Sequence, residues 1–483
     1  MPLLPLGRAF TEAALRDPDR PAVTVDGSTI SRCQLESLAN RMARAFIDYG
    51  VQVGDYVTIG LANSAEFFAA TLAAWKIGAV PQPVSPRLPH REREGIVALA
   101  DSRLVLGAEP GEHPGRVCLP VGWLPAETID DSPLPDAISP TWKAPTSGGS
   151  TGRPKLIVAS DPGVIDTDAD PGMGMVRDGV MLVPGPMYHN APFSYASKAL
   201  VNGNHIITMA RFDAEATLAA AQRYQPTWML LVPTMMLRMT RVTDHRAYDM
   251  SSLRVVWHMA APCPPWLKEE WIDWLGGEKI FELYAGTEAQ AVTVIRGDQW
   301  LAHRGSVGKP IYGEMKVIDA EGNDARPGEV GEIYMRAPDG RVTYRYVGAD
   351  AKRNDEGWES LGDMGWIDEE GFVFLTDRLG DMILSGGANI YPAEIESALD
   401  EYPHVRSSAV IGLPDDDLGN RVHAIVQLAD GFVVTDDELR AYLADRLVRY
   451  KIPRTFEFVT EALRDDAGKV RRSQLRADRI GPA

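Results

Sequence analysis

The sequence is poor in cysteine, lacks long apolar runs and carries fewer basic than acidic residues. Its three cysteines, Cys33, Cys118 and Cys263, are widely spaced, which predicts neither a disulfide framework nor a zinc site. The 49 basic residues are outnumbered by 67 acidic ones, and a net charge of −18 disfavours partners such as nucleic acid or an anionic membrane surface. No apolar run approaches the roughly 18–20 residues of a membrane span. The first 20 residues do not have a signal-peptide layout. We therefore expect a cytoplasmic protein.

What is present indicates a globular protein of more than one domain. The chain has 483 residues, of which 45% are hydrophobic. Helical and strand-like segments alternate through its first three-quarters, most clearly between residues 213 and 288. There "FDAEATLAAAQRY", "PTMMLRMTR" and "PPWLKEEWIDWLG" read as helices, and "TWMLLV", "LRVVWHM" and "KIFELY" read as strands. This alternation predicts an α/β fold with a doubly wound, mostly parallel sheet.

In such sheets ligands bind beyond the carboxyl ends of the strands. Here the strand ends read Val232-Pro233-Thr234, Ala260-Ala261-Pro262 and Ala285-Gly286-Thr287-Glu288. These residues are small or turn-forming, and the last group combines a hydroxyl with a carboxylate. The topology alone therefore places a binding site at these three strand ends.

From about residue 305 the sequence changes to short strand-like segments separated by turns, typical of antiparallel structure. After Arg378 a small α+β pattern begins, with "PAEIESALDEY" and "TDDELRAYLADRL" as helices and "RSSAVIGL" and "RVHAIVQL" as strands. We place the domain boundary at "DRLGD", which gives a large domain over 1–379 and a small one over 380–483.

The segment "TSGGSTGRPK", Thr146 to Lys155, has the composition of a phosphate-binding loop. Its glycines let backbone N–H groups turn toward an anion, its hydroxyls add donors and Lys155 adds a charge. It is not a P-loop, because Gly152 is followed by Arg153 and Pro154 before the lysine. Taken alone the segment also fits a flexible loop, so its meaning depends on the rest of the chain.

Further motifs follow this loop in a fixed order: "YAGTEA", "LGD", "DRLGDMILSGGANIYPAEIE" and "GKVRR". With the loop, this series resembles the adenylate-forming superfamily of acyl-CoA synthetases, adenylation domains and luciferases, and the resemblance covers nearly the whole chain. Within it the sequence looks most like ligases for fatty, aryl and bile-acid or steroid carboxylates. The resemblance implies a large AMP-binding domain with a distorted, barrel-like subdomain near 305–379 and a mobile C-terminal lid.

The resemblance implies a two-step reaction with ATP, Mg²⁺ and CoA. A hydrophobic carboxylate first attacks the α-phosphate of ATP, giving acyl-AMP and pyrophosphate. The CoA thiol then displaces AMP and forms a thioester. The implied partners are the small acid and CoA, without nucleic acid or a membrane span, and a homodimer is left open.

Residue roles in the large domain follow by matching motif positions. Phosphate contacts are implied for Ser150, Thr151, Gly152 and Lys155, Mg²⁺ binding for Thr151 and Glu288, and an α-phosphate contact for Thr287. Adenine stacking is implied for Tyr284, a place in the same nucleotide motif for Gly286, and ribose binding for Asp363 and Arg378. Ala260, Ala261 and Pro262 are matched to the adenine and acyl pocket, and His189 to gating of the acyl pocket. Simpler interpretations exist, such as a strand-end turn at Glu288, a β-turn aspartate at Asp363 and a structural histidine at His189.

In the smaller domain, Ser385, Gly386 and Gly387 match a loop beside the pantetheine arm of CoA, and Lys469 matches a lysine that contacts the reacting carboxylate and α-phosphate. Gly380 stands where the family usually has the Asp or Lys of an interdomain hinge, and it equally fits a simple turn glycine. Arg471 and Arg472 fit either contacts with CoA phosphates or an exposed surface.

Two alternative functions are kept. One is an adenylation enzyme that loads a carrier protein in trans, and the other is a non-catalytic nucleotide-binding descendant. For the acid, Met235 and Met236 just beyond a strand are pocket candidates, and no basic residue stands out there to pair with a second carboxylate. The sequence thus favours a bulky apolar mono-acid.

Overall fold

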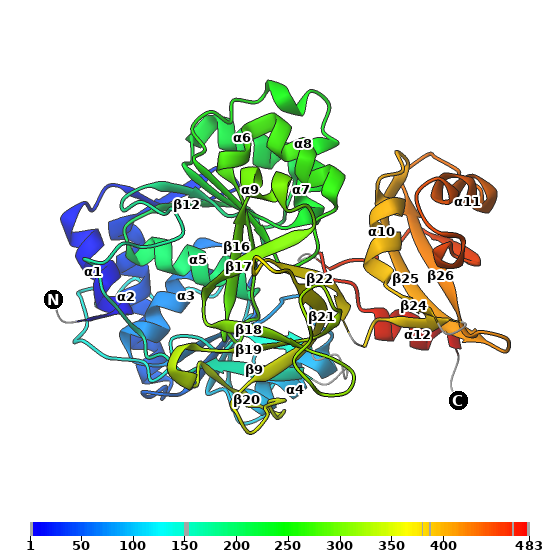
Figure 1. The fold of residues 1–483 in the computed structure, drawn as a ribbon. Coiled ribbons are helices and arrows are strands. Elements are labelled where there is room, and N and C mark those ends of the chain that lie inside the picture. Colours follow the sequence, from blue (N-terminus) through cyan, green and yellow to red (C-terminus); the bar gives the residue numbers. More distant parts are fainter. Residues whose placement is uncertain (1–2, 149–153, 379, 386–387, 466–467, 481–483) are drawn as a thin grey trace.

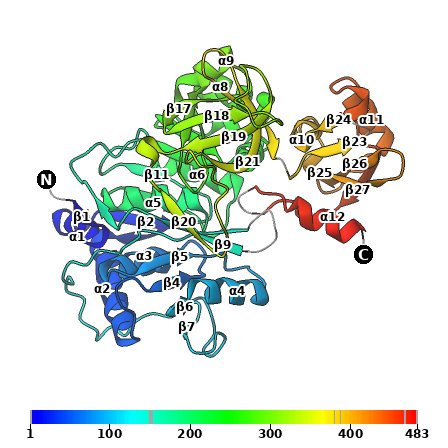
Figure 2. The ribbon, with the colours of Figure 1, turned by 60° about the horizontal axis from the view of Figure 1, so that its bottom comes forward.

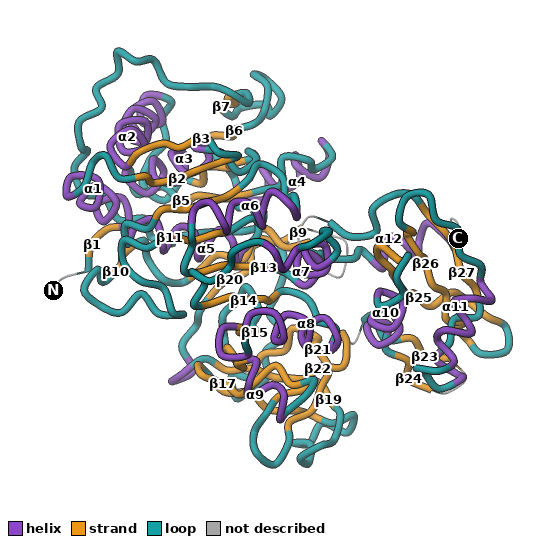
Figure 3. Tube along the Cα trace, turned by 90° about the horizontal axis from the view of Figure 1, so that it is seen from above, coloured by secondary structure: helices purple, strands orange, loops and turns teal. Residues whose placement is uncertain are grey.

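The computed structural model describes residues 3–148, 154–378, 380–385, 388–465 and 468–480. The chain forms a large N-terminal body and a smaller C-terminal body that stands beside it (Figure 1). Seen from above, helices flank the strands of the large body, and the last segment of the chain forms the separate smaller unit (Figure 3). The fold class expected from the sequence, with a large sheet-containing domain and a small C-terminal domain, is confirmed.

The first part of the chain builds a parallel sheet at one end of the large domain (Figure 2). Its strands run in the order β5 (Val80–Pro83), β4 (Tyr56–Ile59), β6 (Leu104–Leu106) and β7 (Val117–Leu119). The neighbouring helices are α1 (Leu6–Arg16), α2 (Arg32–Asp48), α3 (Ala65–Lys76) and α4 (His90–Ala100). Serine caps begin two of them, because Ser31 and Ser64 accept hydrogen bonds from backbone N–H groups three residues on.

A second, larger sheet forms the centre of the molecule. Its parallel part follows the order β15 (Ile280–Tyr284), β14 (Val255–Met259), β13 (Trp228–Leu231), β11 (Val180–Leu182), β12 (His205–Thr208) and β2 (Pro21–Val25), with β3 (Ser28–Ser31) antiparallel at the edge. The connecting helices are α5 (Asn190–Val201), α6 (Ala214–Tyr224), α7 (Pro233–Thr240) and α8 (Pro265–Leu275). Asp213 caps α6 and Pro233 begins α7, as their positions in the sequence predict.

The same sheet continues beyond β15 as antiparallel strands. They are β16 (Val292–Arg296), β17 (Ser306–Tyr312), β22 (Val373–Arg378), β21 (Glu359–Ile367), β19 (Gly331–Arg336) and β18 (Glu314–Ile318), with α9 (Gly297–Ala302) between β16 and β17. Within the described ranges these strands pair in one open order. The subdomain expected near 305–379 is therefore an antiparallel extension of the central sheet.

A small sheet connects the two strands on either side of the expected phosphate-binding loop with a distant strand. Here β9 (Pro154–Ala159) pairs with β8 (Thr146–Gly148) on one side and β20 (Tyr344–Val347) on the other. Tyr346 lies opposite Ile157 in this register, two residues from Lys155. Minor strands β1 (Leu4–Pro5) and β10 (Val164–Ile165) pair elsewhere in the same domain.

The C-terminal body has its own sheets and core. Its strands are β23 (Ile383–Ser385), β24 (Ala388–Ile390), β25 (Val405–Asp415), β26 (Gly419–Leu428) and β27 (Thr455–Val459), and its helices are α10 (Pro392–Asp400), α11 (Asp436–Ala444) and α12 (Arg472–Ile480). Ile395, Leu399 and Leu439 are buried between these elements. The body therefore has a hydrophobic core of its own, as expected for a separate domain.

Candidate active site

The predicted strand ends meet at one cavity. The residues after β13, β14 and β15 all line a continuous space of about 3740 Å³ that extends between the two domains. Ala260, directly after β14, has a left-handed backbone with φ of 74°. Such a conformation is uncommon for a residue with a side chain, and strained backbone of this kind gathers at functional sites. The topology-based expectation of a site at this edge of the sheet agrees with the position of the cavity.

Tyr284 and Asp363, from strands far apart in the sequence, are in direct contact. The Tyr284 hydroxyl donates a hydrogen bond of 2.8 Å to Asp363 Oδ2. Asp363 in turn lies opposite Arg378 in the pairing of β21 with β22. The fold thus gathers the backbone positions of Tyr284, Asp363 and Arg378, three of the residues matched to adenosine. It places the tyrosine ring beside a carboxylate suited to a diol.

Lys155, Glu288 and Tyr346 form a second group in the cavity. The Tyr346 hydroxyl donates to Glu288 Oε1 at 2.5 Å, and Lys155 Nζ lies 3.9 Å from the same oxygen. The ammonium also sits 3.6 Å from the centroid of the Tyr346 ring, a cation–π geometry. Burial and the charge of Glu288 raise the pKa of the Tyr346 hydroxyl, so it stays a proton donor. Sequence reasoning missed Tyr346, for which the aromatic alternation in "YRYV" was the only signal.

Glu288 fits a role at a magnesium ion. Its side chain is buried, and a carboxylate oxygen is a ligand that Mg²⁺ prefers. Within the described parts of the chain no cluster of three or more His, Cys, Asp or Glu side chains would hold a metal. A single carboxylate nevertheless suffices where substrate phosphates and water supply the other ligands.

His189, at the N-cap position of α5, lines the part of the cavity that the sequence assigns to the acyl group. Its ring lies 4.5 Å from that of Tyr188, and both residues line the cavity. Met235 lines it as well, whereas Met236 is fully buried in the core between α7 and its neighbours. The expectation that both methionines face the pocket is therefore corrected for Met236, because α7 turns the two successive side chains to different sides.

Several predicted residues lie outside what the structure describes. They are Ser150, Thr151 and Gly152 of the phosphate loop and Gly386 and Gly387 of the loop matched to pantetheine. Ser385 is described: it ends β23, and its side chain is buried. Ala261, Pro262, Gly286 and Thr287 line the cavity, as their position after the strands predicts.

The loop before Lys469 docks against the large domain. Gly468 has a φ of 76°, and a carbon added at its Cβ position would lie 2.7 Å from Thr234 Oγ1. The Lys469 N–H donates to Asp465 Oδ1 at 2.9 Å, and Asp465 N–H donates back to the Lys469 carbonyl, also at 2.9 Å. Lys469 thus directly follows a glycine that lies against the first turn of α7, at the end of β13.

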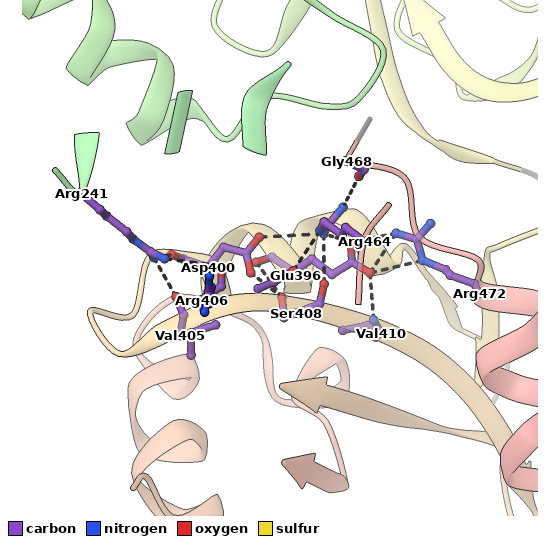
Figure 4. A network of polar contacts seen from close by, with 11 residues as sticks. Arg241, Glu396, Asp400, Val405, Arg406, Ser408, Val410, Arg464, Gly468 and Arg472 are labelled. Carbon is purple, nitrogen blue, oxygen red and sulfur yellow. Dashed lines mark hydrogen bonds and ion pairs between the residues drawn. The ribbon is translucent and has the colours of Figure 1, made fainter. Parts of the chain in front are cut away.

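A buried carboxylate, Glu396 on α10, anchors this turn (Figure 4). Glu396 Oε2 accepts from Arg464 at 3.0 Å and from Arg472 at 2.8 Å, while Val410 N–H donates to Oε1 at 2.8 Å. Arg464 also donates to the Gly468 carbonyl at 3.2 Å. Burial acts to raise the pKa of Glu396, but the charges of Arg472 and Arg464 outweigh it and hold that pKa below its usual range.

Arg472 therefore has a structural role that the sequence did not indicate. Besides Glu396 it binds Asp381, the residue after Gly380, at 3.0 Å. Its side chain is only partly exposed, which corrects the expectation of an exposed surface at Arg472. Arg471 is exposed and lies 3.5 Å from Glu92 of α4 in the large domain. The basic pair thus divides its contacts between the interdomain surface and the interior of the small domain.

Arg241, at the end of α7, forms a further contact between the domains. Its guanidinium donates to the carbonyls of Asp400 at 3.1 Å and Val405 at 2.7 Å. The adjacent Asp400 side chain accepts from the Ser408 hydroxyl at 2.7 Å, and burial raises its pKa to about 6. Among the described residues, contacts at Thr234, Arg241 and Glu92 therefore join the small domain to the large one in the orientation of Figure 1.

Across the described residues, the helices are all too short or too polar to cross a membrane.

Comparison with known proteins places these features in a family context. Residues 10–346 match the family described as AMP-binding enzyme, and residues 394–469 match the AMP-binding enzyme C-terminal domain. A feruloyl-CoA synthase from Amycolatopsis sp is 31% identical, covering 98% of each chain. A fatty acid–[acyl-carrier-protein] ligase, ScoC from Streptomyces coeruleorubidus, is 30% identical over 96% of this chain and 94% of its own. The structure of o-succinylbenzoate CoA synthetase from Bacillus subtilis with its acyl-adenylate intermediate has a TM-score of 0.84, with 26% identity and full coverage of both chains.

Proposed function

We propose that the residues gathered at the strand ends of the central sheet catalyse both steps of acyl-CoA formation. The premise is that this chain belongs to the AMP-binding enzyme family and is an AMP-forming acid–CoA ligase. In the first step a carboxylate oxygen of the acid attacks the α-phosphorus of ATP, and pyrophosphate leaves. In the second step the CoA sulfur attacks the acyl carbon, AMP leaves and the thiol proton passes to solvent. The observation that carries the site assignment is the docking of the Gly468–Lys469 turn on Thr234, beside the nucleotide residues.

The adenosine part of ATP would lie between Tyr284 and the β21–β22 pair. Tyr284 offers its ring to adenine, and its hydroxyl holds Asp363 in place through the 2.8 Å hydrogen bond. Asp363 accepts hydrogen bonds from the ribose hydroxyls, because a carboxylate offers acceptors only. Arg378, whose backbone lies opposite Asp363 in the strand pairing, is assigned to the same sugar. Ala260, Ala261 and Pro262 line the pocket next to them.

The triphosphate would extend toward Lys155 and Glu288. Ser150, Thr151 and Gly152 supply donors to the β- and γ-phosphates together with Lys155, and Thr287 binds the α-phosphate. Mg²⁺, held by Glu288 and Thr151, would neutralise charge on the phosphates. Tyr346 keeps Glu288 in position through its hydroxyl, and Lys155 remains close to both. Lys469 stabilises negative charge gathering at the α-phosphate during attack.

The second step would use a different arrangement of the domains. We place the boundary between residues 379 and 380, with Gly380 as the pivot about which residues 380–483 rotate. Ser385, Gly386 and Gly387 would then border the path of the pantetheine arm, where missing side chains leave room for a narrow chain. Glycine suits a pivot because a few boundary residues absorb large dihedral changes. His189 would separate the acyl pocket from this path.

The acid would enter the apolar part of the cavity beside α5 and α7. Met235, Leu230 and Val232 line this region and are suited to a hydrophobic body. Carrier-protein loading is the second candidate, favoured by the likeness to the carrier-protein ligase ScoC. The test therefore also determines whether CoA or a carrier protein accepts the acyl group.

The test first measures pyrophosphate release with ATP, Mg²⁺ and a panel of fatty, aryl and polycyclic acids. Either CoA or a phosphopantetheinylated carrier protein is then added, and the thioester product is detected. We expect pyrophosphate release with a hydrophobic acid and thioester with CoA. Asp363→Ala is expected to reduce both products sharply through loss of ribose binding. Thioester with the carrier alone would identify the second candidate. Failure of every acid to release pyrophosphate would overturn the proposal in favour of a non-catalytic nucleotide-binding protein.

A further inference from the structure

A buried lysine that plays no part in the steps above lines the acyl side of the cavity. Lys143 lies just before β8, and only 7% of its surface is exposed. Its ammonium donates to Ser194 Oγ at 2.7 Å and to Asn190 Oδ1, both on α5. It also lies 4.3 Å from the centroid of the Trp142 ring. Asn190 directly follows His189 in the chain, so Lys143 is hydrogen-bonded to the neighbour of the residue assigned to gating of the acyl pocket.

In the part of the chain that the structure describes, no carboxylate lies close enough to Lys143 to form an ion pair with it. Its hydrogen-bond partners are a neutral amide and a neutral hydroxyl, and among the described side chains none forms an ion pair with it. Burial lowers the pKa of Lys143 to about 7, against the smaller opposite effect of Asp161. A buried ammonium is costly unless paired, and buried lysines are accordingly rare without a partner. A ligand oxygen would supply the missing partner.

The surroundings match a pocket for a largely apolar molecule with one polar end. Trp75, Trp142 and Ile165 line the same cavity as Lys143 and offer apolar surface. Asn190 and Ser194, four residues apart, lie on the same face of α5, and both line the cavity. Pockets of this type combine apolar walls with a small number of fixed polar groups that determine which molecules bind.

We propose that Lys143 is a specificity-determining residue that binds a second oxygen of the acid substrate, remote from the carboxyl that is activated. The substrate class is then an acid with an apolar, aryl or acyl body and an acceptor oxygen at its far end. That oxygen is a hydroxyl, phenolate or carboxylate, which share the chemistry of accepting from an ammonium. Asn190 and Ser194 orient the lysine toward it. This inference rests on the proposed function, and it replaces the expectation that no basic residue stands near the acyl pocket.

The test compares matched acids on the wild-type enzyme. Cinnamic and phenylbutanoic acids, each as the parent and with a para-hydroxyl or para-carboxyl group, are assayed by kcat/KM for pyrophosphate release. The two chain lengths cover different distances to Lys143, and the two substituents separate a neutral from an anionic oxygen. We expect at least one oxygen-bearing acid to exceed its parent by about 10-fold or more, because an unpaired buried polar group rejects the analogue that lacks its partner.

Variants then assign this preference to a residue. Lys143→Met is expected to abolish the preference by lowering kcat/KM for the oxygen-bearing acid while leaving the parent acid nearly unchanged. Ser194→Ala, which removes one support of Lys143 and keeps its charge, is expected to reduce the preference partly. Lys198→Met is the matched control, because Lys198 is a further cavity-lining lysine on α5. We expect it to retain the preference.

Three results would overturn the inference. Equal kcat/KM for parent and oxygen-bearing acids in the wild type would overturn it without any variant. The inference can therefore be tested even if Lys143→Met fails to fold. An equal loss for all acids in Lys143→Met would show that the lysine only holds α5 in place. Loss of the preference in Lys198→Met but not in Lys143→Met would assign it to the other lysine. Pyrophosphate release with parent acids in each of these cases leaves the proposed function intact.

Discussion

Gly468 of the small domain lies directly against Thr234 of the large domain. A carbon at the Cβ position of Gly468 would be 2.7 Å from Thr234 Oγ1, and the backbone there has a φ of 76°. This contact brings the neighbouring Lys469 to the end of β13, at the edge of the sheet where the nucleotide residues gather. This domain orientation therefore agrees with the role in adenylation that we propose for Lys469.

Gly468→Ala should slow acyl-AMP formation, because a methyl group would meet Thr234 and because alanine disfavours this φ. Thr234→Ala removes the two closest atoms, at 2.7 and 3.1 Å. We therefore expect the double variant Gly468→Ala/Thr234→Ala to regain part of the lost rate in single-turnover assays of acyl-AMP formation. An unchanged rate in Gly468→Ala alone would mean that this contact is absent during adenylation.

Lys469→Ala should reduce the rate of acyl-AMP formation by about 10²-fold or more, as loss of one preorganised charge-stabilising group does. Thioester formation from presynthesised acyl-AMP and CoA should be preserved, because the role that we propose for Lys469 is confined to the first step. Each half-reaction is measured separately by rapid quench. Equal losses in both would contradict the division of roles.

Gly380→Pro should block thioester formation by fixing φ near −65°, if Gly380 is the pivot. Gly380→Ala is the matched control: a Cβ at this position would meet no atom within 4 Å, and the glycine does not have a positive φ. We expect the alanine variant to perform both half-reactions. Normal thioester formation by the proline variant would locate the hinge at another residue.

Arg241→Met should weaken the docked orientation, because two charge-assisted hydrogen bonds to the small domain are lost. A loss of this kind corresponds to about 10-fold in the population of that orientation. Acyl-AMP formation should fall accordingly, while the thioester step from supplied acyl-AMP should not. Arg246→Met is the control, since Arg246 pairs with Glu270 and Asp273 within the large domain. A similar effect of both variants would indicate a general loss of stability.

Asp400→Asn should change how stability depends on pH. Burial raises the pKa of Asp400 in the folded protein to about 6, above its unfolded value, so its contribution to stability is full at low pH and is lost as pH rises through 6. The amide does not ionise. We expect the melting temperature of Asp400→Asn minus that of the wild type to increase by several degrees between pH 4 and pH 7. A difference that stays constant with pH would contradict the titration of Asp400 in this window.

Much of the fold could be predicted from local sequence. The helix over "FDAEATLAAAQRY" begins at its aspartate cap, and the strands "TWMLLV" and "LRVVWHM" are parallel neighbours, because cap chemistry and apolar runs act over a few residues. The motif series also indicated the family and the grouping of Tyr284, Asp363 and Lys155 around one ligand. The assignment of Met236 to the pocket was wrong, because adjacent helical residues face different sides and only packing decides which side is the core.

The sequence by itself determined the fold class, the two-step chemistry and the residues whose types match a nucleotide, since these depend on local pattern and on motifs of fixed spacing. Only the tertiary structure decided which distant groups share a site. It brought Tyr346 to Glu288, Arg472 to Glu396 and Asp381, and Lys143 to α5, over separations of 47 residues and more. The physical reason is that a charge acquires its effect from burial and from its partners, and both are set by the packing of segments that are far apart in the chain.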